Sequence, residues 1–163
     1  MLIGFRRILS PFLGRQAPAD LVWITTELAQ SGRFASREAP VLARLSIGAV
    51  LDLRAEEQHH APLLAKANLH YLHLPIPDRS APTEEELTRA ADWVLQELAA
   101  DRKVLVHCRL GLGRSVTVVT AVLMRMGYPL AEAMALVRRR RPNAALSDSQ
   151  LAALQRYAKS FGT

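Results

Sequence analysis

The sequence predicts an α/β fold, a single-domain sandwich in which helices flank a central, largely parallel sheet. Short apolar segments alternate along the chain with longer amphipathic ones, which is typical of strands interleaved with helices. The chain has 163 residues, 50% of them hydrophobic. A chain of this length buries roughly 70% of its unfolded surface, enough for a core without disulfide or metal staples. No internal repeat or linker divides it.

The first half of the chain holds three expected strands and one helix. Residues 21–25 form a short apolar strand, and residues 49–53 (A-V-L-D-L) form a more deeply buried one. A helical pattern follows over residues 56–67. Residues 69–76 read as the third strand, which ends at a pair of prolines.

A loop rich in turn residues, 77–82, leads into the second half. Thr83 followed by Glu86 forms a capping box, and an apolar stripe continues that helix to about Ala100. Residues 104–107 are a buried strand. Three more helices are expected, at about 114–126, 130–141 and 147–160.

The N-terminal segment, residues 1–18, combines basic and apolar side chains and carries no acidic residue. Its large apolar residues recur at helical spacing, so we expect a strap packed on the domain, with contact to an anionic membrane surface as the first alternative and a cleaved targeting segment as the second. Gly4, Arg6 and Arg7 interrupt the apolar run that a secretory signal needs. The longest apolar stretch, Val116 to Met124, is too short to span a bilayer. We therefore expect a cytoplasmic protein, with peripheral membrane contact left open.

The net charge is +6, and most of the basic residues are arginines. Such a surplus favours anionic partners. Nucleic acid is not expected, because the densest basic run, Arg138 to Arg141, lacks the interleaved aromatic residues used for stacking on bases. The run ends a predicted helix, where cations complement the helix dipole. The alternative is that Arg138 or Arg141 contributes to a rim that binds anions, or braces the active-site loop.

Chemistry concentrates in residues 104–115, V-L-V-H-C-R-L-G-L-G-R-S. A buried strand runs into a loop that opens a helix, so backbone N–H groups and the helix dipole converge as an anion cradle. We expect Gly111 and Gly113 to adopt positive φ, and Arg114 to grip two phosphate oxygens. Cys108, the one cysteine, lies at the base as a thiolate nucleophile. The expected phosphate-binding residues are Arg109, Leu110, Gly111, Leu112, Gly113 and Arg114.

The pattern H-C-x-x-G-x-x-R-S resembles the active-site loop of the cysteine-dependent protein tyrosine phosphatase superfamily. The resemblance implies that Cys108 attacks phosphorus and forms a phosphocysteine. It also implies that Arg114 binds the phosphoryl oxygens and that the Ser115 hydroxyl stabilises the departing thiolate. The weaker flanking matches extend over about residues 22–157, so we assign residues 19–163 to a phosphatase domain.

A poor leaving group needs a proton from a nearby acid. Asp78 lies in I-P-D-x-x-x-P, which resembles the general-acid loop of small dual-specificity phosphatases. The alternative is an ordinary turn aspartate beside proline. Asp52 is the main rival acid, but its pattern places it within a strand.

His107 precedes the cysteine, yet neighbouring strand residues point to opposite faces. We therefore expect His107 to support the loop from below rather than to pair with Cys108. Asn143 is expected to brace the loop as well. The remaining histidines show no metal-ligand spacing, and the chemistry requires no metal or cofactor.

The short chain indicates an atypical dual-specificity phosphatase acting on phosphotyrosine and phosphoserine or phosphothreonine. The expected partner is a phosphorylated protein or a small phosphate ester. Since Arg109 is the one cation among the variable loop residues, phosphoinositides or other small phosphate esters are the alternative. A silent module that binds phosphorylated partners, and a sulfurtransferase or arsenate-reducing enzyme, stay as further alternatives. The first usually lacks the nucleophile or arginine, and arsenate reduction needs a resolving thiol that this chain would have to borrow.

Overall fold

The computed structural model describes residues 20–57 and 61–161, which build five strands and six α-helices. The sheet order is β1-β2-β5-β3-β4; β1 runs antiparallel to β2, and all other neighbours are parallel. This confirms the expected α/β fold with a largely parallel sheet. The strands are β1 (Val22–Trp23), β2 (Leu28–Ser31), β3 (Ile47–Arg54), β4 (His70–Ile76) and β5 (Lys103–His107).

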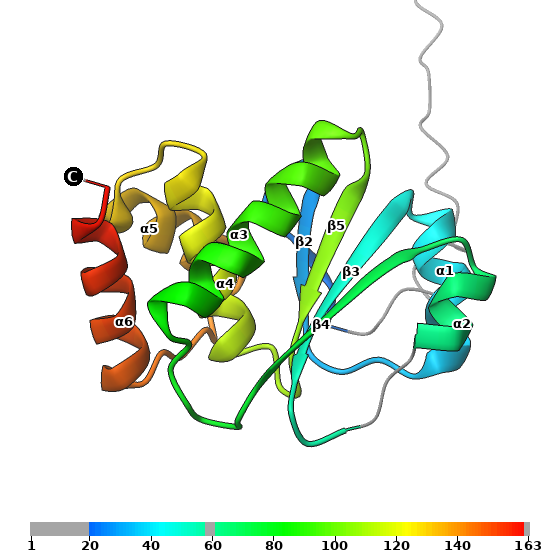
Figure 1. Ribbon diagram of the computed structural model, residues 1–163, viewed down its shortest axis with the longest axis horizontal. Coiled ribbons are helices and arrows are strands. Elements are labelled where there is room, and N and C mark those ends of the chain that lie inside the picture. Colours follow the sequence, from blue (N-terminus) through cyan, green and yellow to red (C-terminus); the bar gives the residue numbers. More distant parts are fainter. Residues whose placement is uncertain (1–19, 58–60, 162–163) are drawn as a thin grey trace, which may run out of the picture.

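Helices cover both faces of the sheet. The two short helices α1 and α2 lie on one side, and the four longer helices lie on the other (Figure 1). Helix α4 is the centre of the thicker layer, since all of its residues from Arg114 to Met124 are buried. The helices are α1 (Ala39–Arg44), α2 (Ala61–Lys66), α3 (Glu84–Ala99), α4 (Arg114–Arg125), α5 (Leu130–Arg140) and α6 (Asp148–Lys159).

The alternation of side chains along the strands divides the core into two clusters. On β5, Val104 and Val106 pack into the cluster under α3, α4, α5 and α6, whereas Leu105 packs under α1 and α2. Strand β3 divides in the same way, with Leu51 on the first side and Val50 on the second. Successive strand residues point to opposite faces, so each central strand needs apolar residues at nearly every position.

One strand and one α-helix were missed in the sequence, and another helix was predicted to begin too early. Strand β2 and helix α1 were not predicted; β2 is only four residues long and includes two polar ones, Gln30 and Ser31. The helix expected over residues 56–67 is described only as α2, because residues 55–57 form a bend. The basic segment 1–18 lies outside the described residues.

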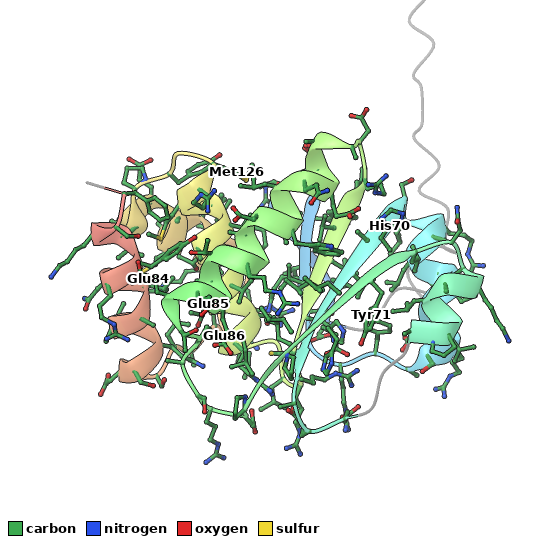
Figure 2. The ribbon with its side chains drawn as sticks, viewed as in Figure 1. His70, Tyr71, Glu84, Glu85, Glu86 and Met126 are labelled. Carbon is green, nitrogen blue, oxygen red and sulfur yellow. The ribbon has the colours of Figure 1, made fainter. Side chains whose placement is uncertain are left out.

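The predicted capping box at the start of α3 is confirmed. The Thr83 hydroxyl accepts the Glu86 N–H (3.1 Å), and the Glu86 carboxylate accepts the Thr83 N–H (2.8 Å). Three glutamates, residues 84–86, occupy the first turn (Figure 2), where negative charge complements the helix dipole. No described helix combines the length and apolar character needed to cross a membrane.

Replacing Thr83 by alanine removes the hydroxyl that caps α3. We expect Thr83→Ala to lower the free energy of unfolding by about 1 kcal/mol, the usual value of such a cap. Urea denaturation measures it, with Arg89→Ala on the exposed side of α3 as the control. Equal stabilities of the two variants would contradict this account of the helix start.

Candidate active site

Three parallel strands end at the same edge of the sheet, and the segments that follow them meet there. Glu56 comes after β3, Asp78 after β4 and Cys108 after β5. In open α/β sheets this carboxyl edge is where ligands bind. A cavity of about 280 Å³ opens at this edge and is lined by Cys108, Arg114 and Asp78.

The loop between β5 and α4 wraps around the sulfur of Cys108. The Gly111 N–H donates to Sγ at 3.3 Å, and α4 begins at Arg114, directly after the loop, so that its first N–H groups and its dipole favour an anion at this end. Gly111 has φ +69°, and a Cβ there would lie 2.6 Å from the Gly32 nitrogen, so this position requires glycine. The loop therefore has the shape of an anion cradle around a thiol.

The expected positive φ at Gly113 was wrong, since its φ is −120°. The structure gives a different reason for glycine at this position. A Cβ on Gly113 would lie only 3.0 Å from both the Nε2 and Oε1 atoms of Gln150. Close approach of α6, rather than backbone conformation, restricts this position.

Ser115 can donate a hydrogen bond to the sulfur, because its other partner, the Gln30 amide nitrogen, only donates. The Ser115 Oγ lies 3.2 Å from Cys108 Sγ and 2.6 Å from Gln30 Nε2. The same Nε2 donates to the Gly111 carbonyl at 2.8 Å, which fixes it as the amide nitrogen. Since Ser115 accepts from Gln30, its own hydroxyl proton is available to Cys108. Gln30, on the unpredicted strand β2, is a site residue that sequence reasoning missed.

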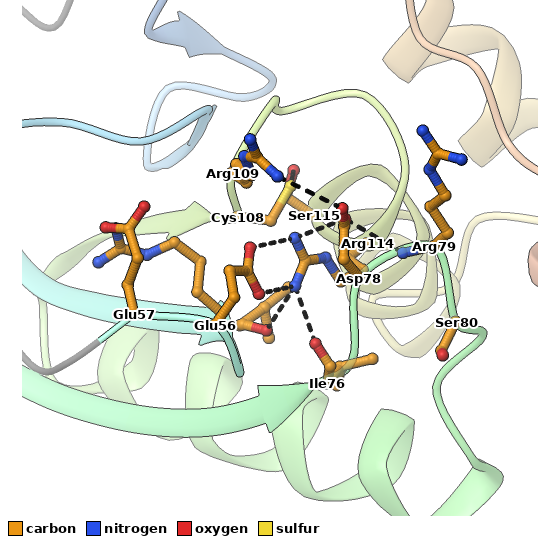
Figure 3. A network of polar contacts seen from close by, with 12 residues as sticks. Glu56, Glu57, Ile76, Asp78, Arg79, Ser80, Cys108, Arg109, Arg114 and Ser115 are labelled. Atoms are coloured by element: carbon orange, nitrogen blue, oxygen red, sulfur yellow. Dashed lines mark hydrogen bonds and ion pairs between the residues drawn. The ribbon is translucent and has the colours of Figure 1, made fainter.

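Arg114 is 2% exposed, and its guanidinium is the best-connected group of the site (Figure 3). Its two terminal nitrogens bind both oxygens of Glu56 at 2.8 and 2.7 Å, and Nη1 also donates to the Ile76 carbonyl at 2.8 Å. Burial alone would lower the pKa of Arg114, but the Glu56 hydrogen bonds and the nearby charges of Cys108 and Asp78 raise it. Arg114 is thus a fixed cation.

Glu56 was also missed by the sequence analysis. The pattern placed it in a helix, facing no particular group, and no local signal marks it as part of the site. Hydrogen bonds from Arg114 lower the pKa of Glu56. Its two-pronged contact orients the guanidinium plane toward the cavity, so Glu56 is a positioning residue for Arg114.

Asp78 lines the cavity together with Cys108 and Arg114. Its Oδ1 accepts from Arg114 Nη2 at 2.9 Å, and its Oδ2 lies 3.8 Å from Arg109 Nη1. The Ser80 N–H bonds to the Pro77 carbonyl (3.1 Å) and closes a tight turn around Asp78. Within that turn Arg79 has φ +62°, a conformation that costs free energy in a residue with a Cβ.

The remaining loop residues are partly or largely exposed. Leu110 is 64% exposed, and it lines the cavity together with Leu112. The Arg109 side chain is half exposed. Asn143, expected to brace the loop, is an exposed residue; the brace from that segment is the Ala145 N–H, which donates to the Leu112 carbonyl at 3.0 Å.

His107 is fully buried beneath the loop, beside a second charged network. Its Nε2 lies 3.5 Å from Asp52 Oδ1, and Arg54 binds both Asp52 oxygens at 2.9 Å. Burial would raise the pKa of Asp52, but the Arg54 hydrogen bonds and the charge of His107 outweigh it and hold that pKa well below its usual range. Asp52 is only 1% exposed and stays ionised, so it is not suited to donate a proton.

The arginine run divides by burial. Arg141 is 4% exposed; its Nη2 donates to the main-chain carbonyls of Asp20 and Gln30. Burial lowers the pKa of Arg141, against the charges of Asp20 and Cys108. Arg138 is exposed. Arg141 thus braces the chain behind the cradle, whereas Arg138 is a solvated cation.

Within residues 20–57 and 61–161, no group of three histidine, cysteine, aspartate or glutamate side chains is arranged to hold a metal ion.

A profile of the dual specificity phosphatase catalytic domain matches residues 31–160. The chain belongs to this family. The matched residues include the cradle, the Asp78 loop and helices α4 and α6. The membership therefore rests on the whole fold around the site.

Two relatives from Arabidopsis thaliana illustrate the range of the family. Phosphatidylglycerophosphate phosphatase PTPMT2 is 28% identical over 127 residues, which are 76% of this chain and 56% of the relative. Dual specificity protein phosphatase 1B is 38% identical over 96 residues, which are 56% of each chain. The chain thus spans about half the length of these relatives.

Solved structures share the fold. The crystal structure of Tk-PTP in its active form superposes with a TM-score of 0.81 at 36% identity, covering 86% of this chain and 97% of that one. Human DUSP28 gives a TM-score of 0.79 at 24% identity over 90% of this chain and 98% of its own, a likeness of fold.

Removing the charge of Glu56 should cost stability in a way that depends on pH. Because Arg114 lowers the folded-state pKa of Glu56, its contribution is complete above the ordinary glutamate pKa of about 4.3 and is lost as pH falls through the folded-state value. We expect Glu56→Gln to be less stable than the wild type by about 1 to 3 kcal/mol at pH 7, with a difference that shrinks in acid.

Urea denaturation from pH 7 to pH 3 measures this difference. Glu27→Gln, at an exposed glutamate, makes the same charge change away from the site. A stability difference at Glu56 that is absent at pH 7, or constant down to pH 3, would contradict the role assigned to the ion pair.

Proposed function

We propose that this protein hydrolyses phosphomonoesters through a phosphocysteine intermediate, and that it acts on phosphorylated tyrosine, serine and threonine side chains of proteins. The observation that carries the proposal is the convergence of three groups on one cavity. A thiol hydrogen-bonded by Gly111 and Ser115 lies next to a fixed guanidinium, Arg114, and a carboxyl group, Asp78.

In the first step the Cys108 sulfur attacks phosphorus, the bond from phosphorus to the ester oxygen breaks, and Asp78 gives its proton to that oxygen. Arg114 and the loop N–H groups bind the other phosphoryl oxygens, where charge is concentrated in the transition state. In the second step water attacks phosphorus, Asp78 takes a proton from the water, and the sulfur leaves as a thiolate. The Ser115 hydroxyl stabilises that thiolate.

The cavity rim favours a protein substrate. Leu110, Leu112 and Ala145 give the opening an apolar wall, which suits the aromatic or aliphatic part of a phosphorylated side chain. Arg79 is the cation at the rim, and Arg109 lies near the Asp78 carboxylate without lining the cavity. An active thiol also needs a reducing compartment, so we place the protein in the cytoplasm.

The second candidate substrate is a phosphate ester on a lipid headgroup or another small molecule. One relative is named for phosphatidylglycerophosphate, and the N-terminal segment carries Arg6, Arg7 and Arg15, which would favour an anionic membrane surface. The two candidates share the chemistry and differ in what surrounds the phosphate.

Hydrolysis of para-nitrophenyl phosphate without added metal tests the chemistry. We expect Cys108→Ser to abolish phosphate release. On unsubstituted phenyl phosphate, whose basic leaving oxygen needs a proton, we expect Asp78→Asn to reduce kcat/KM by roughly 10²- to 10⁴-fold, the usual range for a general acid, and to have a much smaller effect on para-nitrophenyl phosphate. Phosphate release by Cys108→Ser near the wild-type rate would contradict the proposal. Phosphate binding by a wild-type protein that turns over no phosphate ester would support a silent binding module instead.

Substrate class is tested by comparing kcat/KM for phosphotyrosine and phosphothreonine peptides with that for phosphatidylglycerophosphate and phosphoinositide vesicles. We expect the peptides to be hydrolysed faster, because the rim is mainly apolar. Faster hydrolysis of the vesicles, together with a lower kcat/KM on vesicles when residues 1–18 are deleted, would favour the lipid candidate.

A further inference from the structure

Helix α6 approaches the site through one buried side chain that the chemistry above does not use. Gln150 is 3% exposed and lines the same cavity as Cys108. Its Oε1 accepts the Ser147 N–H at 3.0 Å and caps the helix, while its Nε2 donates to the Ser80 carbonyl at 3.2 Å. One amide therefore joins the N-terminus of α6 to the turn that holds Asp78.

The hydrogen bond to Ser80 bears on Asp78 because residues 77–80 form one hydrogen-bonded turn. The Ser80 N–H closes the turn on the Pro77 carbonyl at 3.1 Å, and the Arg79 N–H bonds to the Asp78 carboxylate, also at 3.1 Å. Holding the Ser80 carbonyl therefore fixes the height of the carboxyl group above the cradle. The Gln150 amide also lies so close to Gly113 that a Cβ there would be only 3.0 Å from it, so Gln150 stands between the turn and the cradle.

The ion pair between Asp78 and Arg114 also holds this turn, but binding of the phosphoryl group to Arg114 weakens that ion pair. Asp78 is bound to Arg114 at 2.9 Å as an ion pair. A general acid must be protonated and must face the leaving oxygen, and the phosphoryl group competes for the same guanidinium. The hydrogen bond from the Gln150 side-chain amide to the Ser80 carbonyl involves no charge, so it does not depend on that ion pair.

We propose that Gln150 is a positioning residue for the general acid: its side-chain amide holds the Asp78 turn over the cradle while the phosphoryl group occupies Arg114. The inference rests on the proposed function, since it takes Asp78 as the proton donor. Gln150 touches neither the phosphorus nor the leaving group and acts through Ser80.

Leaving-group dependence separates this role from a general loss of structure. A basic leaving oxygen needs the proton from Asp78, whereas an acidic one departs almost without it. We therefore compare kcat/KM over a series of aryl phosphates running from strongly electron-poor phenols to unsubstituted phenol. Two variants remove the donor differently: Gln150→Glu keeps the acceptor for the Ser147 N–H, and Gln150→Met keeps the length and neutrality of the side chain.

Two reference variants complete the design. Ala153→Gly destabilises the middle of α6, and Ala153 does not line the cavity. Asp78→Asn shows the full effect of losing the acid. We expect both Gln150 variants to lose roughly 10- to 100-fold on the basic leaving groups, as for a misplaced catalytic group, and to change little on the acidic ones. Ala153→Gly should lower Tm and leave the leaving-group dependence as in the wild type.

A loss of kcat that is equal on all leaving groups, with kcat/KM unchanged and phosphoenzyme accumulating in acid-quenched samples, would overturn the inference, because Gln150 would then act in the second step. Unchanged kinetics in the Gln150 variants would overturn it as well. So would a leaving-group dependence in Ala153→Gly that matches the one in the Gln150 variants. If Asp78→Asn itself shows no leaving-group dependence, the assignment of the acid fails and the inference fails with it.

Discussion

The whole carboxyl edge of the sheet is arranged around one buried positive charge. A guanidinium out of water needs anionic or carbonyl partners in fixed positions, and Arg114 obtains them from segments that follow two different strands. Glu56 binds it in a fork from the end of β3, and the Ile76 carbonyl and Asp78 reach it from the end of β4. The cation that would bind substrate thus also holds the two loops in register.

A second dependence runs through neutral groups. The Gln30 amide donates to both the Gly111 carbonyl and the Ser115 hydroxyl, and this leaves the hydroxyl proton for the Cys108 sulfur. Strand β2 is short, yet its Gln30 side chain joins the Gly111 carbonyl to the Ser115 hydroxyl. The helix dipole of α4 and the loop N–H groups act at the same sulfur, so the thiol lies in a field that is fixed before any substrate arrives.

Local patterns in the sequence were enough for the parts of the site that local forces build. The cradle, the strand before it and the Thr83 capping box follow from residues within a few positions of one another. Glu56, Gln30 and Gln150 were missed, because their roles arise from contacts with residues 58, 85 and 70 positions away along the chain. The pattern around Glu56 even favoured a helix, and tertiary contact with Arg114 accompanies a bend there instead.

The central claim, that phosphorus passes through Cys108, is tested most directly by trapping the intermediate. Ser115→Ala removes the hydroxyl 3.2 Å from the sulfur and should slow the departure of the thiolate more than its attack. Acid quenching during turnover, followed by peptide mass analysis, should show one phosphoryl group on the peptide that contains Cys108. Continued turnover with no adduct, or an adduct on another peptide, would contradict the account.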